Sequence, residues 1–167
     1  MQQIDIQRED VRIGPGSQVA PVADTRVLFV LSADCMFQLA GHLYALGPGS
    51  VIVLPGQAGG RLLYGKHCRY LSLQLGALVE DPLELQRQLR RLLSGLTHLR
   101  PDSVRFSRLV GDLMRLDELV AMGEGRGKAA YARLYDLVVN LVSLSKSEVG
   151  EVAAQHGPST LIQDVRA

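Results

Sequence analysis

The sequence has few of the residues on which many metalloenzymes and secreted proteins depend. It contains no tryptophan, two cysteines and four histidines in 167 residues. Between Val11 and Val79 there is no glutamate, and the only histidines there are His42 and His67. A catalytic metal usually needs several histidine and carboxylate ligands at one place. This scarcity predicts a chain that holds no metal ion and needs no cofactor.

Long apolar runs and a strong net charge are also missing. No run approaches the roughly 20 apolar residues of a membrane helix, and Met1–Asp10 is too polar for a signal peptide. The formal net charge of +1 gives no overall attraction to nucleic acid or anionic lipid. Cys35 and Cys68 do not form a disulfide framework, and we expect reduced, packed thiols. The expected protein is soluble and cytoplasmic, with no membrane partner.

Short apolar runs separated by glycine- and proline-rich turns fill the chain up to about Gly76. Runs of this length and spacing are typical of a β-sandwich or barrel. Residues 1–16 alternate apolar and polar side chains, and this arm is predicted either to add an edge strand or to fold over the barrel mouth. The strands expected after the arm are 27–31, 35–39, 43–46, 50–54, 61–64 and 69–75.

The period of the apolar residues changes from two to about 3.6 after Asp81. We expect a first helix over Leu83–Leu96, a second over Val104–Met122 and a third over Lys128–Lys146. Asp102 and Ser103 are candidate N-caps of the second helix, and Gly123 ends it. The predicted organisation is an arm (1–16), a barrel (17–79), a helical dimerisation region (80–146), and a linker leading into a truncated C-terminal DNA-binding domain (147–167).

The third helix carries a broader apolar stripe than one barrel face would need to cover. A monomer rarely exposes such a stripe, so an antiparallel pair of copies is one way to bury it. The alternative is that the first two helices cover the stripe within one chain. The first interpretation predicts a homodimer whose interface contains Tyr131, Leu134, Val138, Leu141 and Val142.

The strand expected at 69–75 has two different faces. Leu71, Leu73 and Leu75 share one face, which should be core, whereas Tyr70, Ser72 and Gln74 share the other. The polar face either lines a pocket with hydrogen-bonding groups or simply meets water.

The segment Leu46–Gly56, which reads LGPGSVIVLPG, resembles the second conserved segment of the cupin barrels. A barrel, two or three helices, a linker and a helical start at Thr160–Ala167 together resemble the N-terminal half of AraC-type transcription regulators. The resemblance implies an α+β fold: an N-terminal cupin-like (jelly-roll) β-barrel followed by about three α-helices. It also implies a small-molecule effector bound in the barrel, a homodimer, and DNA contact only through a C-terminal domain outside this sequence.

Candidate effector contacts follow from that resemblance, because the family places them on the strand after the Pro-Gly turn and on the last barrel strand. The candidates are Tyr70, Ser72 and Arg61. Tyr44 and Phe37 are candidate apolar walls of the lumen, and the alternative for both is plain core packing. The chain has Ala33-Asp34-Cys35 where the family usually has Gly-x-Gly. It also has no tryptophan, so it offers no tryptophan ring on which a sugar could stack. The identity of the effector does not follow from the sequence.

Enzymatic motifs are absent from the sequence. It has no Gly-x-Ser-x-Gly elbow, no phosphate-binding glycine loop, and no glutamate among the barrel residues to pair with Asp24 or Asp34. Residues 80–167 hold twelve basic and twelve acidic residues, so this part should not bind DNA by itself. We expect a non-enzymatic sensor module of a bacterial regulator. The alternative is a stand-alone, metal-independent cupin-like isomerase or epimerase.

Overall fold

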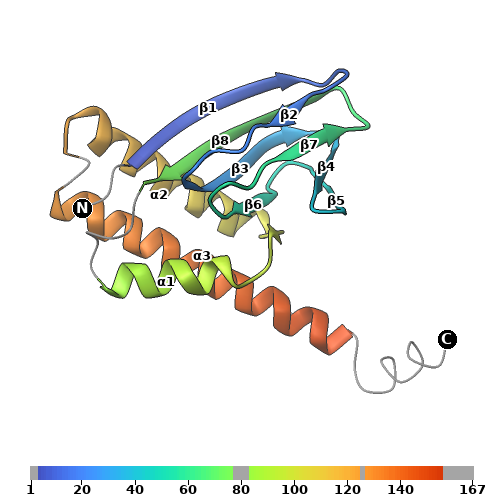
Figure 1. Ribbon diagram of the computed structural model, residues 1–167. Coiled ribbons are helices and arrows are strands. Elements are labelled where there is room, and N and C mark those ends of the chain that lie inside the picture. The colour runs from blue at the N-terminus through green and yellow to red at the C-terminus, as the bar shows by residue number, and fades with distance from the viewer. Residues whose placement is uncertain (1–3, 77–82, 125–126, 156–167) are drawn as a thin grey trace.

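A computed structural model describes residues 4–76, 83–124 and 127–155 (Figure 1). One sheet contains, in spatial order, β1 (Ile4–Arg12), β8 (His67–Leu75), β3 (Thr25–Ala33), β6 (Val51–Leu54) and β9 (His98–Leu99). The other contains β2 (Gln18–Val19), β7 (Gly60–Leu63), β4 (Met36–Leu39) and β5 (His42–Ala45). The ladders are antiparallel, and the helices follow the barrel strands along the chain. The predicted α+β class, with a cupin-like barrel before the helices, is confirmed.

The N-terminal segment is an edge strand of the larger sheet. β1 pairs with β8 along its whole length, from Ile4 opposite Leu75 to Arg12 opposite His67. Of the two alternatives for the arm, the structure has the edge strand. The six strands expected after the arm correspond to β3 through β8, whereas the two-residue strands β2 and β9 were not predicted.

The strands of the larger sheet separate two hydrophobic cores, because alternate side chains point to opposite faces. Leu71, Leu73 and Leu75 of β8 belong to the core that the helices share. Leu28 of β3 and Tyr70 of β8 belong to the core between the two sheets. Each strand of this sheet therefore has one face toward the helices and one toward the barrel lumen.

Three helices lie in the part of the chain described after the barrel: α1 (Leu83–Leu93), α2 (Ser103–Ala121) and α3 (Lys128–Gln155). Asp102 caps α2 as predicted, because its carboxylate accepts a hydrogen bond from the Arg105 backbone N–H at 2.8 Å. The chain leaves α2 through Gly123, whose φ of +78° suits glycine. α3 continues past Lys146 to Gln155, so the end predicted for the third helix is wrong, while a linker and a further domain after it stay a prediction. The helical start predicted at residues 160–167 lies outside the described residues.

The broad stripe of α3 is buried within the chain. Leu134, Val138, Leu141 and Val142 are at most 5% exposed and pack with the leucines of α1 and α2, and Tyr131 is partly buried beside them. α3 contacts both α1 and α2, and this double contact explains why its stripe is wider than one partner needs. The expectation of a free surface on these five residues is therefore corrected, since their own chain already covers them. A homodimer stays a prediction that needs other surface.

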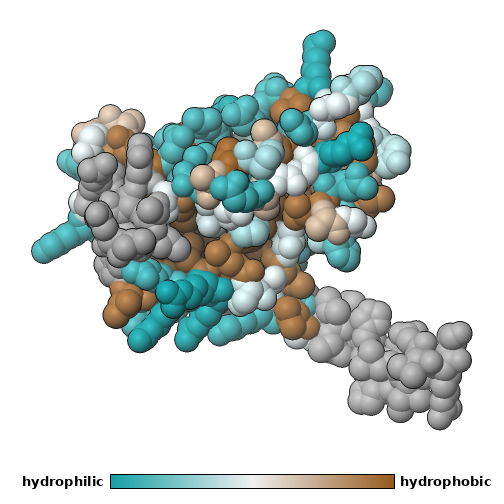
Figure 2. Space-filling model, in the orientation of Figure 1, coloured by the Kyte–Doolittle hydropathy of each residue, from teal (hydrophilic) through white to brown (hydrophobic). Residues whose placement is uncertain are grey.

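The surface agrees with this layered arrangement. Figure 2 shows apolar side chains gathered between the strands and α1, and hydrophilic ones along the outer side of α1.

Cys35 and Cys68 are both buried and free. In the part of the chain that the structure describes, no helix is long and apolar enough to span a membrane.

Candidate functional site

The lumen between the two sheets is the candidate site. Its walls are mostly apolar, and Leu28, Ile52 and Leu54 from the larger sheet meet Phe37 and Leu62 from the smaller one. All five are at most 3% exposed. These side chains fill the centre of the barrel, so polar groups matter most where they interrupt this packing.

Tyr70 and Ser72, both predicted as effector contacts, lie on the inner face of β8. Tyr70 is 7% exposed and Ser72 is 9% exposed. Burial, with a smaller effect from the Glu9 carboxylate, raises the pKa of Tyr70 to about 12. The phenol therefore stays protonated at neutral pH and can donate a hydrogen bond. The two faces of the strand predicted from the sequence are those that the structure has.

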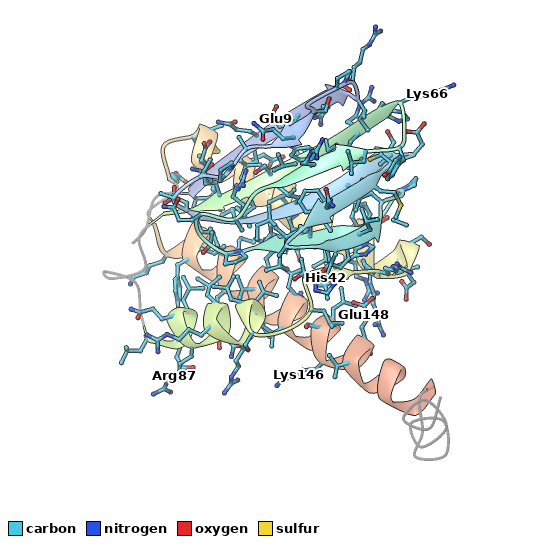
Figure 3. All side chains as sticks on the ribbon, turned by 45° about the vertical axis from the view of Figure 1, so that its right-hand side comes forward. Glu9, His42, Lys66, Arg87, Lys146 and Glu148 are labelled. Atoms are coloured by element: carbon cyan, nitrogen blue, oxygen red, sulfur yellow. The ribbon has the colours of Figure 1, made fainter. Side chains whose placement is uncertain are left out.

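The inner face of β1 extends this polar row. Glu9 lies opposite Tyr70, Gln7 opposite Ser72 and Asp5 opposite Gln74, so these side chains share one face of the sheet. Figure 3 shows Glu9 in the strand layer, whereas Arg87, Lys146 and Glu148 belong to the helical layer. The sequence suggested an edge strand here but gave no sign that its polar residues would line up with β8.

Arg26 is the polar lumen residue that the sequence reasoning missed. It follows Asp24 and Thr25 at the start of β3, lies between Leu54 of β6 and Gln74 of β8, and is only 7% exposed. Its Nη2 donates to the Ala58 carbonyl at 2.8 Å. Burial lowers the pKa of Arg26, and the nearby Tyr70 opposes this effect. The predicted strand began at residue 27, one residue after Arg26. A strand that began at Arg26 would have placed its side chain on the same inner face as Leu28 and Val30.

The remaining predicted residues are divided between inside and outside. Phe37 is 1% exposed in the centre of the barrel, and Tyr44 is half-buried against the same core. Arg61 is exposed on β7, between Gln18 and Gln38 on the neighbouring strands, and its neighbour Leu62 points into the barrel. The structure thus brings Tyr70 and Phe37 into one core and leaves Arg61 on the outer face.

Tyr44 belongs to the end of the barrel near β9. Its ring meets the His98 ring edge-on, with 5.7 Å between ring centres, and His98 Nε2 lies 3.1 Å from the Ser50 hydroxyl. Burial, helped by Arg100, lowers the pKa of His98 to about 4. The imidazole is therefore neutral near pH 7 and acts as a hydrogen-bonding and packing group.

The histidines of the barrel do not assemble a set of metal ligands. His42 is exposed on β5, and His67 lies near Ser32 and Asp34 at the start of β8. Backbone N–H groups of His67 and Lys66 donate to the Asp34 carboxylate and lower its pKa. Among the residues that the structure describes, no three histidine, cysteine or acidic side chains are placed to hold a metal ion.

A hollow lies outside the barrel, between α2 and α3. It measures about 320 Å³ and is lined by Arg105, Arg108, Asn140, Ser143 and Ser147 over a leucine floor. Its arginines are exposed to solvent, and Arg105 already pairs with Asp102 at 3.6 Å. The lumen differs because its polar groups are buried, where a hydrogen bond discriminates more strongly between ligands.

Comparison with known proteins gives structural likeness only. No protein family model and no curated protein matches the chain. The AraC-like transcriptional activator CuxR matches over 86% of this chain and 61% of its own, with 12% identity and a TM-score of 0.48. A cupin protein from Bacteroides fragilis matches over 47% of this chain and 70% of its own, with 11% identity and a TM-score of 0.39.

A third solved structure is described as a putative mannose-6-phosphate isomerase from Ralstonia eutropha. It matches over 44% of this chain and 75% of its own, with 16% identity and a TM-score of 0.36. At such low sequence identity the likeness lies in the arrangement of the backbone, and it does not extend to a ligand or a reaction. The chain has a cupin-like barrel followed by helices, and its function has to be argued from its own residues.

Proposed function

We propose that this chain is the effector-sensing module of a bacterial AraC-type transcription regulator. In this proposal a small molecule binds reversibly in the lumen without a metal ion. Binding then controls a DNA-binding domain beyond the sequence described here. The chain itself catalyses no reaction.

The observation that carries the proposal is the double role of β8. Tyr70 and Ser72 point into the lumen, while Leu71, Leu73 and Leu75 of the same strand pack in the core that contains α1, α2 and α3. A ligand that shifts β8 therefore acts directly on the helical layer, because packed cores rearrange between discrete states rather than deform gradually. This strand links the lumen to the hydrophobic core that the helices share.

The protonation states of the lumen residues support binding rather than catalysis. General acid-base catalysis works best when the group has a pKa near the working pH. Burial raises the pKa of both Tyr70 and Cys68 to about 12, so neither side chain is a base at neutral pH. Both suit a site that holds a ligand without transforming it.

Dimerisation and DNA contact form the second part of the proposal. Two copies would meet through the outer sides of the helices, because the stripe on α3 is used within the chain. α3 reaches Gln155, so it leads from the sensor core toward the segment where we expect the DNA-binding domain to begin.

The proposal is tested by thermal shift with a metabolite panel on residues 1–167, since a bound ligand raises the apparent stability by mass action. Compounds that raise Tm are then titrated against Tyr70→Phe and the matched control Tyr64→Phe. Tyr64 is 77% exposed, so its hydroxyl lies outside the lumen. We expect Tyr70→Phe to weaken binding and Tyr64→Phe to leave it unchanged. Hits that tolerate both changes equally, or that the protein converts into product, would argue against a lumen sensor.

A further inference from the structure

Arg26 is a buried cation that makes no ion pair with any acidic residue of the described part of the chain. Of its side-chain nitrogens, Nη2 donates to the Ala58 carbonyl at 2.8 Å, while the buried Nε has no hydrogen-bond partner. No carboxylate of the described residues lies within 4.0 Å of the guanidinium. A buried charge without a partner is costly, so a protein that keeps one usually has a use for it.

The two nitrogens concerned form one edge of the guanidinium. Nε–H and the adjacent Nη2–H point in parallel, and this edge matches the two oxygens of a carboxylate. In the structure Nη2 donates to a single neutral carbonyl oxygen, and Nε has no acceptor. A carboxylate would satisfy both donors and neutralise the charge.

The acidic residues of the same region are engaged elsewhere. The Asp24 carboxylate accepts a hydrogen bond from Gln74 Nε2 at 2.9 Å, and the Asp5 carboxylate accepts one from Gln7 Nε2 at 2.9 Å. Glu9 lies opposite Tyr70, two strands away from Arg26. Asp5 and Glu9 would repel an anion that approached β1, so an anionic ligand group is best placed at β3, against Arg26.

We propose that the Nε/Nη2 edge of Arg26 is the anchor for a carboxylate group of the effector. The inference rests on the proposed function of the lumen as a binding site. The ligand carboxylate displaces the Ala58 carbonyl, because a charged acceptor forms a stronger hydrogen bond than a neutral one. The uncharged part of the ligand lies toward Tyr70 and the apolar wall.

Displacement of Ala58 also provides a way into the filled lumen. Ala58 lies in the connection between β6 and β7, which is held by hydrogen bonds from Gln57 N to Val22 O and from Ala58 N to Pro55 O. Releasing the Arg26 contact frees this connection from β3, so the anchor and the entrance are the same place.

The test uses residues 1–167 and pairs of probes that differ only in charge. Acetate is compared with acetamide, benzoate with benzamide, and inorganic phosphate serves as a different oxyanion. Binding is followed by thermal shift and by the ¹H–¹⁵N signal of the Arg26 Nε–H. The variants are Arg26→Gln and Arg26→Lys, with Arg8→Gln as a control at an exposed arginine of β1. Arg26→Met replaces Arg26→Gln if the latter does not fold.

We expect the carboxylates to raise Tm and move the Arg26 signal, and the amides to do neither. Arg26→Gln should weaken carboxylate binding at least about tenfold, Arg26→Lys should weaken it less, and Arg8→Gln should leave it unchanged. The inference is overturned if amides bind as well as carboxylates. It is also overturned if no probe moves the Arg26 Nε–H signal and the Nε–H donates to a water molecule instead. Phosphate binding through Arg26 without carboxylate binding would also overturn it.

The proposed function fails separately. Panel compounds that bind in a Tyr70-dependent way while the Arg26 signal stays still would keep the sensor proposal and remove the carboxylate anchor. If no panel compound raises Tm in a way that depends on Tyr70, the sensor proposal itself is wrong.

Discussion

Replacing Leu141 with alanine tests whether the stripe of α3 is core or interface. Leu141 is 0% exposed and lies in the cluster that joins the helices to the larger sheet. Truncating a buried leucine costs about 2–5 kcal/mol, through lost burial and the cavity left behind. Since neighbouring side chains from several elements enclose this site and limit its collapse, we expect about 3–4 kcal/mol. For a domain of this size that corresponds to a fall in Tm of roughly 10 °C.

Urea denaturation followed by circular dichroism gives the free energy of unfolding, and light scattering at the same concentration gives the mass. Lys146→Ala is the matched control on the same helix, because Lys146 is exposed and should change stability by less than about 0.5 kcal/mol. We expect Leu141→Ala to lose stability with the mass of the native state unchanged. A loss below about 1 kcal/mol together with a halved mass would refute the core assignment and restore the stripe as a dimer interface.

Three further predictions concern other parts of the fold. Ser145→Ala should cost about 1–3 kcal/mol of unfolding free energy, because the Ser145 hydroxyl accepts a hydrogen bond from the Leu96 backbone N–H at 3.1 Å; urea denaturation checks this, and an unchanged midpoint would contradict it. Gly60→Ala should lower Tm, because the added Cβ would lie 2.5 Å from the Phe37 ring and from a backbone carbonyl oxygen. The control Gly111→Ala in α2 adds its Cβ in open space and should raise the free energy of unfolding by up to about 1 kcal/mol. Equal shifts in Tm for the two variants would argue against the packing of β7. The free energy of unfolding should fall as the pH drops from about 6.5 toward about 4, because in this range His98 binds a proton in the unfolded chain but not in the folded one. His98→Gln should flatten that part of the pH profile. An identical slope in the variant would show that His98 is not the cause.

The strands were predictable because each carries its own local signal. Turn residues separate the runs from Val27 to Leu75, and the leucines of β8 alternate with its polar residues, so both faces of that strand could be assigned from the sequence. Asp102 and Gly123 marked the ends of α2 in the same way. The two-residue strands β2 and β9 gave no signal, since they exist only through their partners β7 and β6.

The candidate site was only partly predictable, for a physical reason. Tyr70 and Ser72 could be placed because alternation fixes the face on which they lie. Arg61 was chosen from its position after the Pro-Gly turn, by resemblance to the family, and it lies on the outer face of β7. Arg26 was not predicted as a lumen residue, because a charged residue at the end of a strand is usually exposed to solvent. Only the neighbouring strands and the connection that contains Ala58 bury it.

The broad stripe of α3 shows a different limit. The pattern correctly indicated that two surfaces cover this helix, but the sequence does not say whether the second surface belongs to the same chain. Leu137 and Leu144, which widened the stripe, are buried in the helical core of the same chain.

Amide hydrogen exchange with and without a panel compound that raises Tm tests most directly whether the lumen and the helices are coupled through β8. The account predicts slower exchange in His67–Leu75 and, with it, in the buried part of α3 around Val138. Slower exchange confined to α2 and α3, with the strands unchanged, would place the ligand in the outer hollow and contradict a sensor built on the barrel.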